Sequence, residues 1–109
     1  MRIAIFGAAL ALVLSTMSVA AGDPPRRKTH TVMMVGMKFK PEVLTVAHGD
    51  TIVWVNQDVV SHTATSATAG FDSKAVDPEK RWKLTVQKKG DFPYICKYHP
   101  LMKGTLRVK

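Results

Sequence analysis

The stretch "FPYICKYHPLMKGTLRV", residues 92–108, decides the fold of this chain, because it sets two strand patterns around one short turn. Apolar side chains recur at every second position before and after that turn, which is the period of a half-buried β-strand: they are Phe92, Tyr94, Cys96, Leu106 and Val108. The last apolar position before the turn is Cys96. We therefore expect its sulfur to point into the interior at one end of the molecule.

The rest of the chain continues this strand pattern. Runs rich in β-branched and apolar residues occur at 29–35, 42–50, 51–56, 59–66 and 81–87. The run 51–56 directly follows a Gly-Asp turn, so we expect it to return beside 42–50 as a hairpin. Residues 67–80 are the least regular and indicate a loop. With Trp54 and Trp82 as core aromatics, the sequence predicts an all-β fold, a Greek-key β-sandwich or barrel of about seven to eight strands.

The chain begins with a short apolar run. Arg2 precedes "IAIFGAALALVL", residues 3–14, and small residues suited to cleavage follow. This arrangement is typical of a secretory signal peptide, and the run is shorter than the roughly 20 apolar residues that a membrane anchor needs. We expect a signal peptide over residues 1–21, a flexible lead-in over 22–28 and one domain over 29–109. The protein would be exported to the periplasm, with no stable membrane insertion after cleavage.

The charge of the chain is strongly basic. It holds 16 Lys and Arg against 8 Asp and Glu, a formal net charge of +8. Such a balance favours anionic partners, namely an acidic protein, a membrane surface or nucleic acid. Nucleic acid fits an exported protein poorly, and the basic residues stand in scattered groups such as 26–28 and 88–89. Two interpretations of the basic residues therefore stay open: they form a docking surface for an anionic partner, or they are simply a solvated surface.

Cys96 is the single cysteine, so it cannot form a disulfide within the chain. Packing, nucleophilic chemistry and metal ligation remain. His99 follows at a spacing of three, Pro100 biases it toward extended backbone, and Met102 lies further along the same turn. His62, 34 positions before Cys96, stands on a strand that can flank the same end. One thiolate, two imidazoles and one thioether form the donor set of a blue-copper electron-transfer site.

With these residues in place, the chain resembles the cupredoxins, and most closely the amicyanin-like type 1 copper proteins. The matching parts are "MKFKPEVLTVAHGDTIVWVNQD" (37–58), His62 and "KGDFPYICKYHPLMKGTLRV" (89–108). The compact Cys-x₂-His-x₂-Met loop favours this subgroup over the plastocyanin-like and pseudoazurin-like proteins, whose loops are usually longer. Family members often carry Asn just after the first histidine ligand. Thr63 stands there in this chain, which puts the rigidity of the ligand loops in question.

The resemblance implies a function and a set of partners. One copper ion, cycling between Cu(I) and Cu(II), would be held by four ligands: His62, Cys96, His99 and Met102. The protein, expected to be a monomer, would shuttle single electrons, with a periplasmic dehydrogenase and a c-type cytochrome as partners. Electrons would pass through His99, within an apolar patch framed by Pro100, Leu101 and Met37. Lys97 and Lys103 flank that patch and would steer partners with acidic docking surfaces.

Other uses of the same residues are weighed as alternatives. A periplasmic copper-binding or chaperone protein would use exposed Met- and His-rich loops and no strand-held cysteine. A thiol enzyme with Cys96 activated by His99 needs a cleft and an oxyanion-stabilising device, so no enzymatic activity is expected. A structural zinc site would need four strong ligands, and methionine is a poor fourth ligand for zinc. His30 and His48 lie outside the matching motif and are not expected to be ligands, and Met33 and Met34 are expected to pack.

Overall fold

The protein is described as a computed structural model, which covers residue 7 and residues 27–109. The signal peptide expected over residues 1–21 and most of the lead-in lie outside these described residues, apart from the single residue 7. Within the described part, no helix has the length and apolar character needed to span a membrane.

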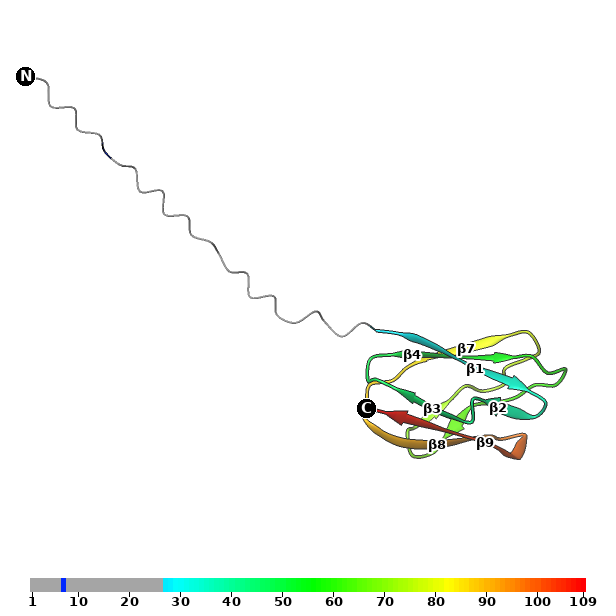
Figure 1. Cartoon of the computed structure of the whole chain (residues 1–109). Helices are drawn as coiled ribbons and strands as arrows, with labels where there is room; N and C mark the ends of the chain where they lie inside the picture. Colours follow the sequence, from blue (N-terminus) through cyan, green and yellow to red (C-terminus); the bar gives the residue numbers. More distant parts are fainter. Residues whose placement is uncertain (1–6, 8–26) are drawn as a thin grey trace, which may run out of the picture.

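The described chain folds as two β-sheets packed face to face, which confirms the predicted all-β sandwich. One sheet has the strand order β2-β1-β4-β7 and the other the order β3-β9-β8-β5-β6. Figure 1 shows β1, β4 and β7 in the upper layer and β3, β8 and β9 in the lower one. The strands are β1 (Thr29–Val35), β2 (Lys38–Lys40), β3 (Val43–Val46), β4 (Thr51–Asn56), β5 (Thr65–Ser66), β6 (Phe71–Asp72), β7 (Arg81–Thr85), β8 (Gly90–Cys96) and β9 (His99–Val108).

The hairpin expected between residues 42–50 and 51–56 is wrong. Strand β3 pairs in parallel with β9, whereas β4 pairs with β1 and β7, so the two successive strands belong to different sheets. The corner between them is closed by Asp50, whose backbone N–H donates to the Ala47 carbonyl at 3.0 Å. The Asp50 carboxylate accepts bonds from the backbone N–H of Lys28 at 3.0 Å and from Ala47 at 3.1 Å. These contacts direct the chain across to the other sheet instead of back along β3.

Two further expectations differ from the structure in detail. The run 59–66 was expected as one strand, but only Thr65–Ser66 is a strand, and His62 joins the sheet system through an isolated bridge to Val76. The loop 67–80 contains the short strand β6, Phe71–Asp72. Both segments are tied locally by side-chain hydrogen bonds, such as Ala64 N–H to Ser73 Oγ at 2.7 Å. Side chains therefore replace part of the regular ladder here.

The core between the sheets is aromatic. Trp54 is fully buried, with its ring centroid 5.3 Å from Trp82, 5.6 Å from Tyr94 and 5.8 Å from Phe71. The expected role of Trp54 in the core is confirmed, and Trp82 packs against the same cluster while partly exposed. Tyr94 lies directly over Gly104, where an added Cβ would come within 2.5 Å of the phenol oxygen. Because Gly104 has no side chain, β9 leaves room for the Tyr94 ring of the neighbouring strand β8.

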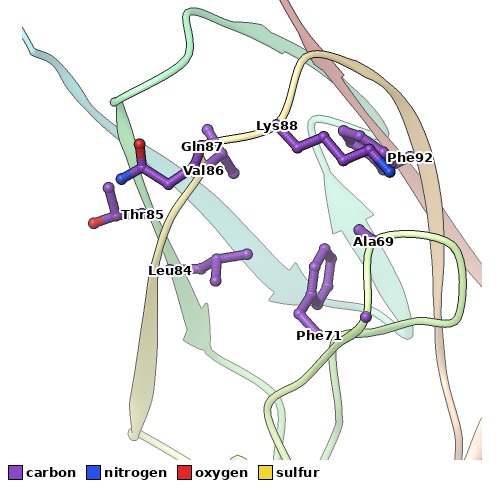
Figure 2. A pocket seen from close by; sticks show the side chains of 9 residues that line it. Ala69, Phe71, Leu84, Thr85, Val86, Gln87, Lys88 and Phe92 are labelled. Carbon is purple, nitrogen blue, oxygen red and sulfur yellow. The ribbon is translucent and has the colours of Figure 1, made fainter.

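An apolar cavity of about 260 Å³ opens between the edge strand β7 and the loop before β6. Figure 2 shows Phe71, Leu84, Val86 and Phe92 around it, with Lys88 at its rim. The Lys88 Nζ atom lies 6.0 Å from the centroid of the Phe92 ring. None of the residues predicted from sequence to bind metal lines this cavity.

Candidate metal centre

The predicted ligands come from two separate parts of the chain. Cys96 ends β8 and His99 begins β9, and these two residues face each other across the turn of the hairpin. His62 lies between β4 and β5, where it exchanges backbone hydrogen bonds with Val76 at 3.1 and 2.7 Å. His62 and Cys96 are both fully buried. Strand pairing at one end of the sandwich therefore brings residues 34 positions apart into one place.

The distance between His62 Nδ1 and Cys96 Sγ is 3.8 Å. Metal–nitrogen and metal–thiolate bonds of about 2.0 and 2.3 Å, as in zinc sites, would place two such atoms about 3.7 Å apart at a trigonal angle. The observed spacing therefore fits a nitrogen and a sulfur that share one metal ion. The described residues contain no group of three His, Cys, Asp or Glu side chains already gathered as a metal site. The pair of His62 and Cys96 is the geometric centre of the candidate.

The other two predicted ligands lie beside this pair. The ring of His99 stands 5.2 Å from that of His62, centroid to centroid, with an angle of 70° between the ring planes. Met102, on β9, is 3% exposed and lines one surface hollow together with His99. The structure thus places all four predicted residues at the same end of the sandwich, with His62 and Cys96 inside and His99 partly exposed.

Asp58 contacts the buried histidine, and the sequence analysis missed it. Its Oδ2 atom lies 2.7 Å from Nε2 of His62, so a proton on Nε2 leaves Nδ1 free to face Cys96. The same carboxylate accepts the backbone N–H groups of Gly36 at 2.7 Å and Met37 at 3.0 Å. Burial opposes ionisation, but these hydrogen bonds hold the pKa of Asp58 below its usual value. The only sequence signal was a carboxylate four residues before a histidine.

Thr63 links the two segments that carry the candidate ligands His62 and Cys96. Its backbone N–H donates to Cys96 Sγ at 3.3 Å, and its hydroxyl oxygen accepts the backbone N–H of Lys97 at 2.9 Å. The hydroxyl also lies 3.0 Å from that of Thr65. The side chain that departs from the family pattern therefore still ties the loops together, through one hydroxyl where the family often uses an amide.

The surface over His99 is an apolar hollow of about 390 Å³. Its lining residues are Met37, Tyr98, His99, Pro100, Leu101 and Met102. Leu101 is 93% exposed, and Met37 frames the site as the sequence suggested. Lys103 lines the adjoining hollow together with Lys38. Lys97 differs from expectation, because its Nζ atom pairs with the Asp72 carboxylate at 2.6 Å, which helps to lower the pKa of Asp72 to about 2.

His30 and His48 lie away from this site, at the opposite end of the sandwich. His30 Nε2 is 2.8 Å from Asp50 Oδ2, and His48 Nδ1 is 3.2 Å from the carbonyl oxygen of Lys109. Both contacts are made near the beginning of β1 and the end of β9, far along the strands from the turn that carries His99 (Figure 1).

The sequence and the fold of this chain are similar to those of known proteins. A family model described as a cupredoxin-like domain matches residues 5–108. Amicyanin-alpha of Methylorubrum extorquens is 30% identical, with both chains covered over their full length. Among solved structures, a methionine-to-alanine mutant of amicyanin in its Cu(I) state has a TM-score of 0.69 and 26% identity, covering 74% of this chain and 82% of that one. A Cu-containing nitrite reductase from Thermus scotoductus SA-01 has a TM-score of 0.70 and 34% identity, covering 74% of this chain but 22% of the reductase.

Proposed function

This chain belongs to the cupredoxin-like domain family and is similar to the amicyanins, and on that premise we propose that it is a blue copper electron-transfer protein of the periplasm. The copper would be held by His62, Cys96, His99 and Met102. The observation that carries the proposal is the 3.8 Å separation of His62 Nδ1 and Cys96 Sγ inside the sandwich. A thiolate and an imidazole at ligand spacing, beside a second imidazole and a thioether, match the donor set of this class of site.

The bound copper would supply the one-electron redox chemistry, and the chain's own residues would set its surroundings. Thr63 donates its backbone N–H to the Cys96 sulfur at 3.3 Å, and a copper-bound thiolate there could keep this hydrogen bond. Asp58 Oδ2 lies 2.7 Å from His62 Nε2, and this contact fixes the orientation of the imidazole ring. Since both residues are held by contacts of the fold, the donor positions would change little between oxidation states.

Electron exchange with partners would take place at the hollow around His99. Its exposed apolar lining, above all Leu101, suits a small docking contact between proteins. Lys103 and Lys38 beside it would favour partners with acidic docking surfaces, with a rate that falls as salt rises. Lys97 contributes less than the sequence suggested, because Asp72 neutralises it. A periplasmic dehydrogenase as electron donor and a c-type cytochrome as acceptor are the partners we propose.

Export and domain organisation also belong to this proposal. Residues 1–21 would be removed as a signal peptide, and residues 22–28 would lead into a single domain over 29–109. We propose a monomeric carrier without enzymatic activity, and the similarity to the amicyanins supports the carrier role. A role in copper storage or delivery is less well supported, because Cys96 and Met102 are buried instead of lying in an open loop.

The test is to add Cu(II) to purified apoprotein and to record visible and EPR spectra. The wild type should develop an intense thiolate-to-copper absorption, and Cys96→Ser should abolish it. His48→Gln is the matched control, because His48 lies at the far end of the sandwich and should leave the spectrum unchanged. Blue colour that survives in Cys96→Ser would show that the ligand assignment is wrong.

A further inference from the structure

The two sheets differ sharply in charge. The four strands of the sheet β2-β1-β4-β7 contain four basic residues and no Asp or Glu. The five strands of the other sheet contain two basic residues, Lys103 and Arg107, and two acidic ones, Asp72 and Asp91. The excess positive charge of the strands is therefore confined to one layer of the sandwich.

The basic residues of that layer lie on its outer face. Lys38 and Lys40 on β2, and Arg81 and Lys83 on β7, are all exposed, whereas the alternate positions of these strands pack inward. We call Lys38, Lys40, Arg81 and Lys83 the cationic face. In the described part of the chain three ion pairs occur, and none involves a residue of this face. Its four charges are therefore available to an external anion.

Between the two basic edges lies an apolar strip. Met33 on β1 is directly opposite Lys40 on one side and Val55 on the other, and Val55 is opposite Arg81. One row of paired residues across the sheet therefore consists of Lys40, Met33, Val55 and Arg81, with a basic residue at each end. Neighbouring strands lie about 4.8 Å apart, so the two basic edges are about 14 Å from each other. Long basic side chains that flank an apolar surface can reach outward to anions while their stems cover the strip.

We propose that the cationic face docks on an anionic phospholipid surface. Charge complementarity supports this occupant, because anionic headgroups attract basic residues near the membrane. An acidic protein is a weaker fit, since protein interfaces are usually anchored by Trp, Tyr and Arg, and Arg81 is the one residue of these types among the four of the cationic face. The aromatic residues of these strands, Phe39, Trp54 and Trp82, belong to or pack on the core. The exposed aromatic at the copper end, Tyr98, marks that end as the protein-docking surface instead.

Docking through this face would leave the copper end accessible. The candidate ligands lie at the ends of strands, whereas the cationic face is formed by the flat of the sheet. If the sheet β2-β1-β4-β7 lay flat against the membrane, the His99 hollow would face sideways, along the membrane plane. Apart from Lys38, which borders both surfaces, membrane docking and electron exchange would then use different parts of the same molecule.

The proposal is tested by co-sedimentation with vesicles of phosphatidylcholine alone and of phosphatidylcholine with phosphatidylglycerol, at low and high salt. We expect binding only to the anionic vesicles, lost at high salt. Each basic residue near the surface contributes about fivefold in affinity, so Arg81→Gln/Lys83→Gln should weaken binding about 30-fold. The control, Lys89→Gln/Arg107→Gln, removes the same charge elsewhere and should weaken binding less than about threefold.

Three results would overturn the proposal. Equal binding to both vesicle types would exclude recognition of anionic lipid. Equal losses in the two double variants would show that net charge, and not this face, controls binding. Unchanged vesicle binding with slower electron exchange in Arg81→Gln/Lys83→Gln would assign the face to an acidic protein. Cys96→Ser, which lacks the proposed thiolate ligand, should bind anionic vesicles like the wild type, so failure of the copper assignment would be seen separately.

Discussion

Replacing Thr63 by Val removes the hydroxyl that ties together the two segments carrying the candidate ligands, while nearly conserving side-chain volume. Thr63 is 1% exposed, and its Oγ1 atom accepts the backbone N–H of Lys97 at 2.9 Å. In the variant this N–H faces a methyl group. Because the two segments are 34 residues apart in sequence, the loss of this bond loosens a long-range connection.

The expected cost follows from the unpaired donor. A buried polar group that loses its only partner destabilises a protein by about 1–3 kcal/mol. The Lys97 to Thr63 bond is only partly buried, so we expect about 1.5 kcal/mol. For a domain of this size, the midpoint of thermal unfolding should fall by about 6–12 °C.

The assay combines thermal and urea unfolding of the apoprotein with hydrogen exchange at the Lys97 amide. Thr63→Val should lower the unfolding midpoint and accelerate exchange at that amide. Thr63→Ser keeps the hydroxyl and should retain most of the stability and the slow exchange. An unchanged melting temperature and unchanged Lys97 exchange in Thr63→Val would refute the reasoning, as would an equal loss in Thr63→Ser.

Three further variants test other contacts. Gly104→Ala should destabilise the fold by about 1–3 kcal/mol in urea titrations, because the new Cβ meets the Tyr94 ring; stability like the wild type's would show that the ring moves at little cost. Asp50→Asn should be less stable than the wild type, with the difference shrinking as pH falls from about 4 to 2 in urea titrations. The reason is that hydrogen bonds, first from the Lys28 N–H and then from the His30 ring, lower the pKa of Asp50 from 3.8 to about 2. A difference independent of pH would contradict this. Asp58→Asn should weaken copper binding about 10- to 100-fold in chelator competition, and an unaltered ring-proton spectrum of His62 in the apoprotein would argue against positioning by Asp58.

The alternation of apolar residues was enough to predict most of the strands. Phe92, Tyr94 and Cys96 are buried as a set, and so are Leu106 and Val108. The partner of each strand was harder to predict. A Gly-Asp turn between two alternating runs is compatible with a hairpin and with a corner between sheets. The chain forms a corner here because the Asp50 carboxylate accepts hydrogen bonds from the backbone N–H groups of Ala47 and Lys28. The Ala47 contact lies within the turn, whereas the Lys28 contact joins the turn to a distant part of the chain.

The candidate site, like the fold, could be predicted only in part from the sequence. Spacing alone pointed to Cys96, His99 and Met102, because a short turn must keep its residues together. Asp58 escaped notice because its role depends on where the His62 ring points, which is set by packing. The pairing of Lys97 with Asp72 joins residues 25 positions apart and has no local signature. Side-chain orientations set by packing, and contacts between distant segments, therefore account for what the sequence did not reveal.

The position of β9 has a consequence for the order in which the second sheet can form. This final strand, His99–Val108, lies between β3 and β8 in the second sheet. Without β9, β3 has no partner in that sheet, and the hairpin that brings His99 beside Cys96 cannot close. The pairing of β3 and the gathering of the candidate ligands therefore depend on the same long-range strand addition, which is the kind of step that slows the folding of β proteins.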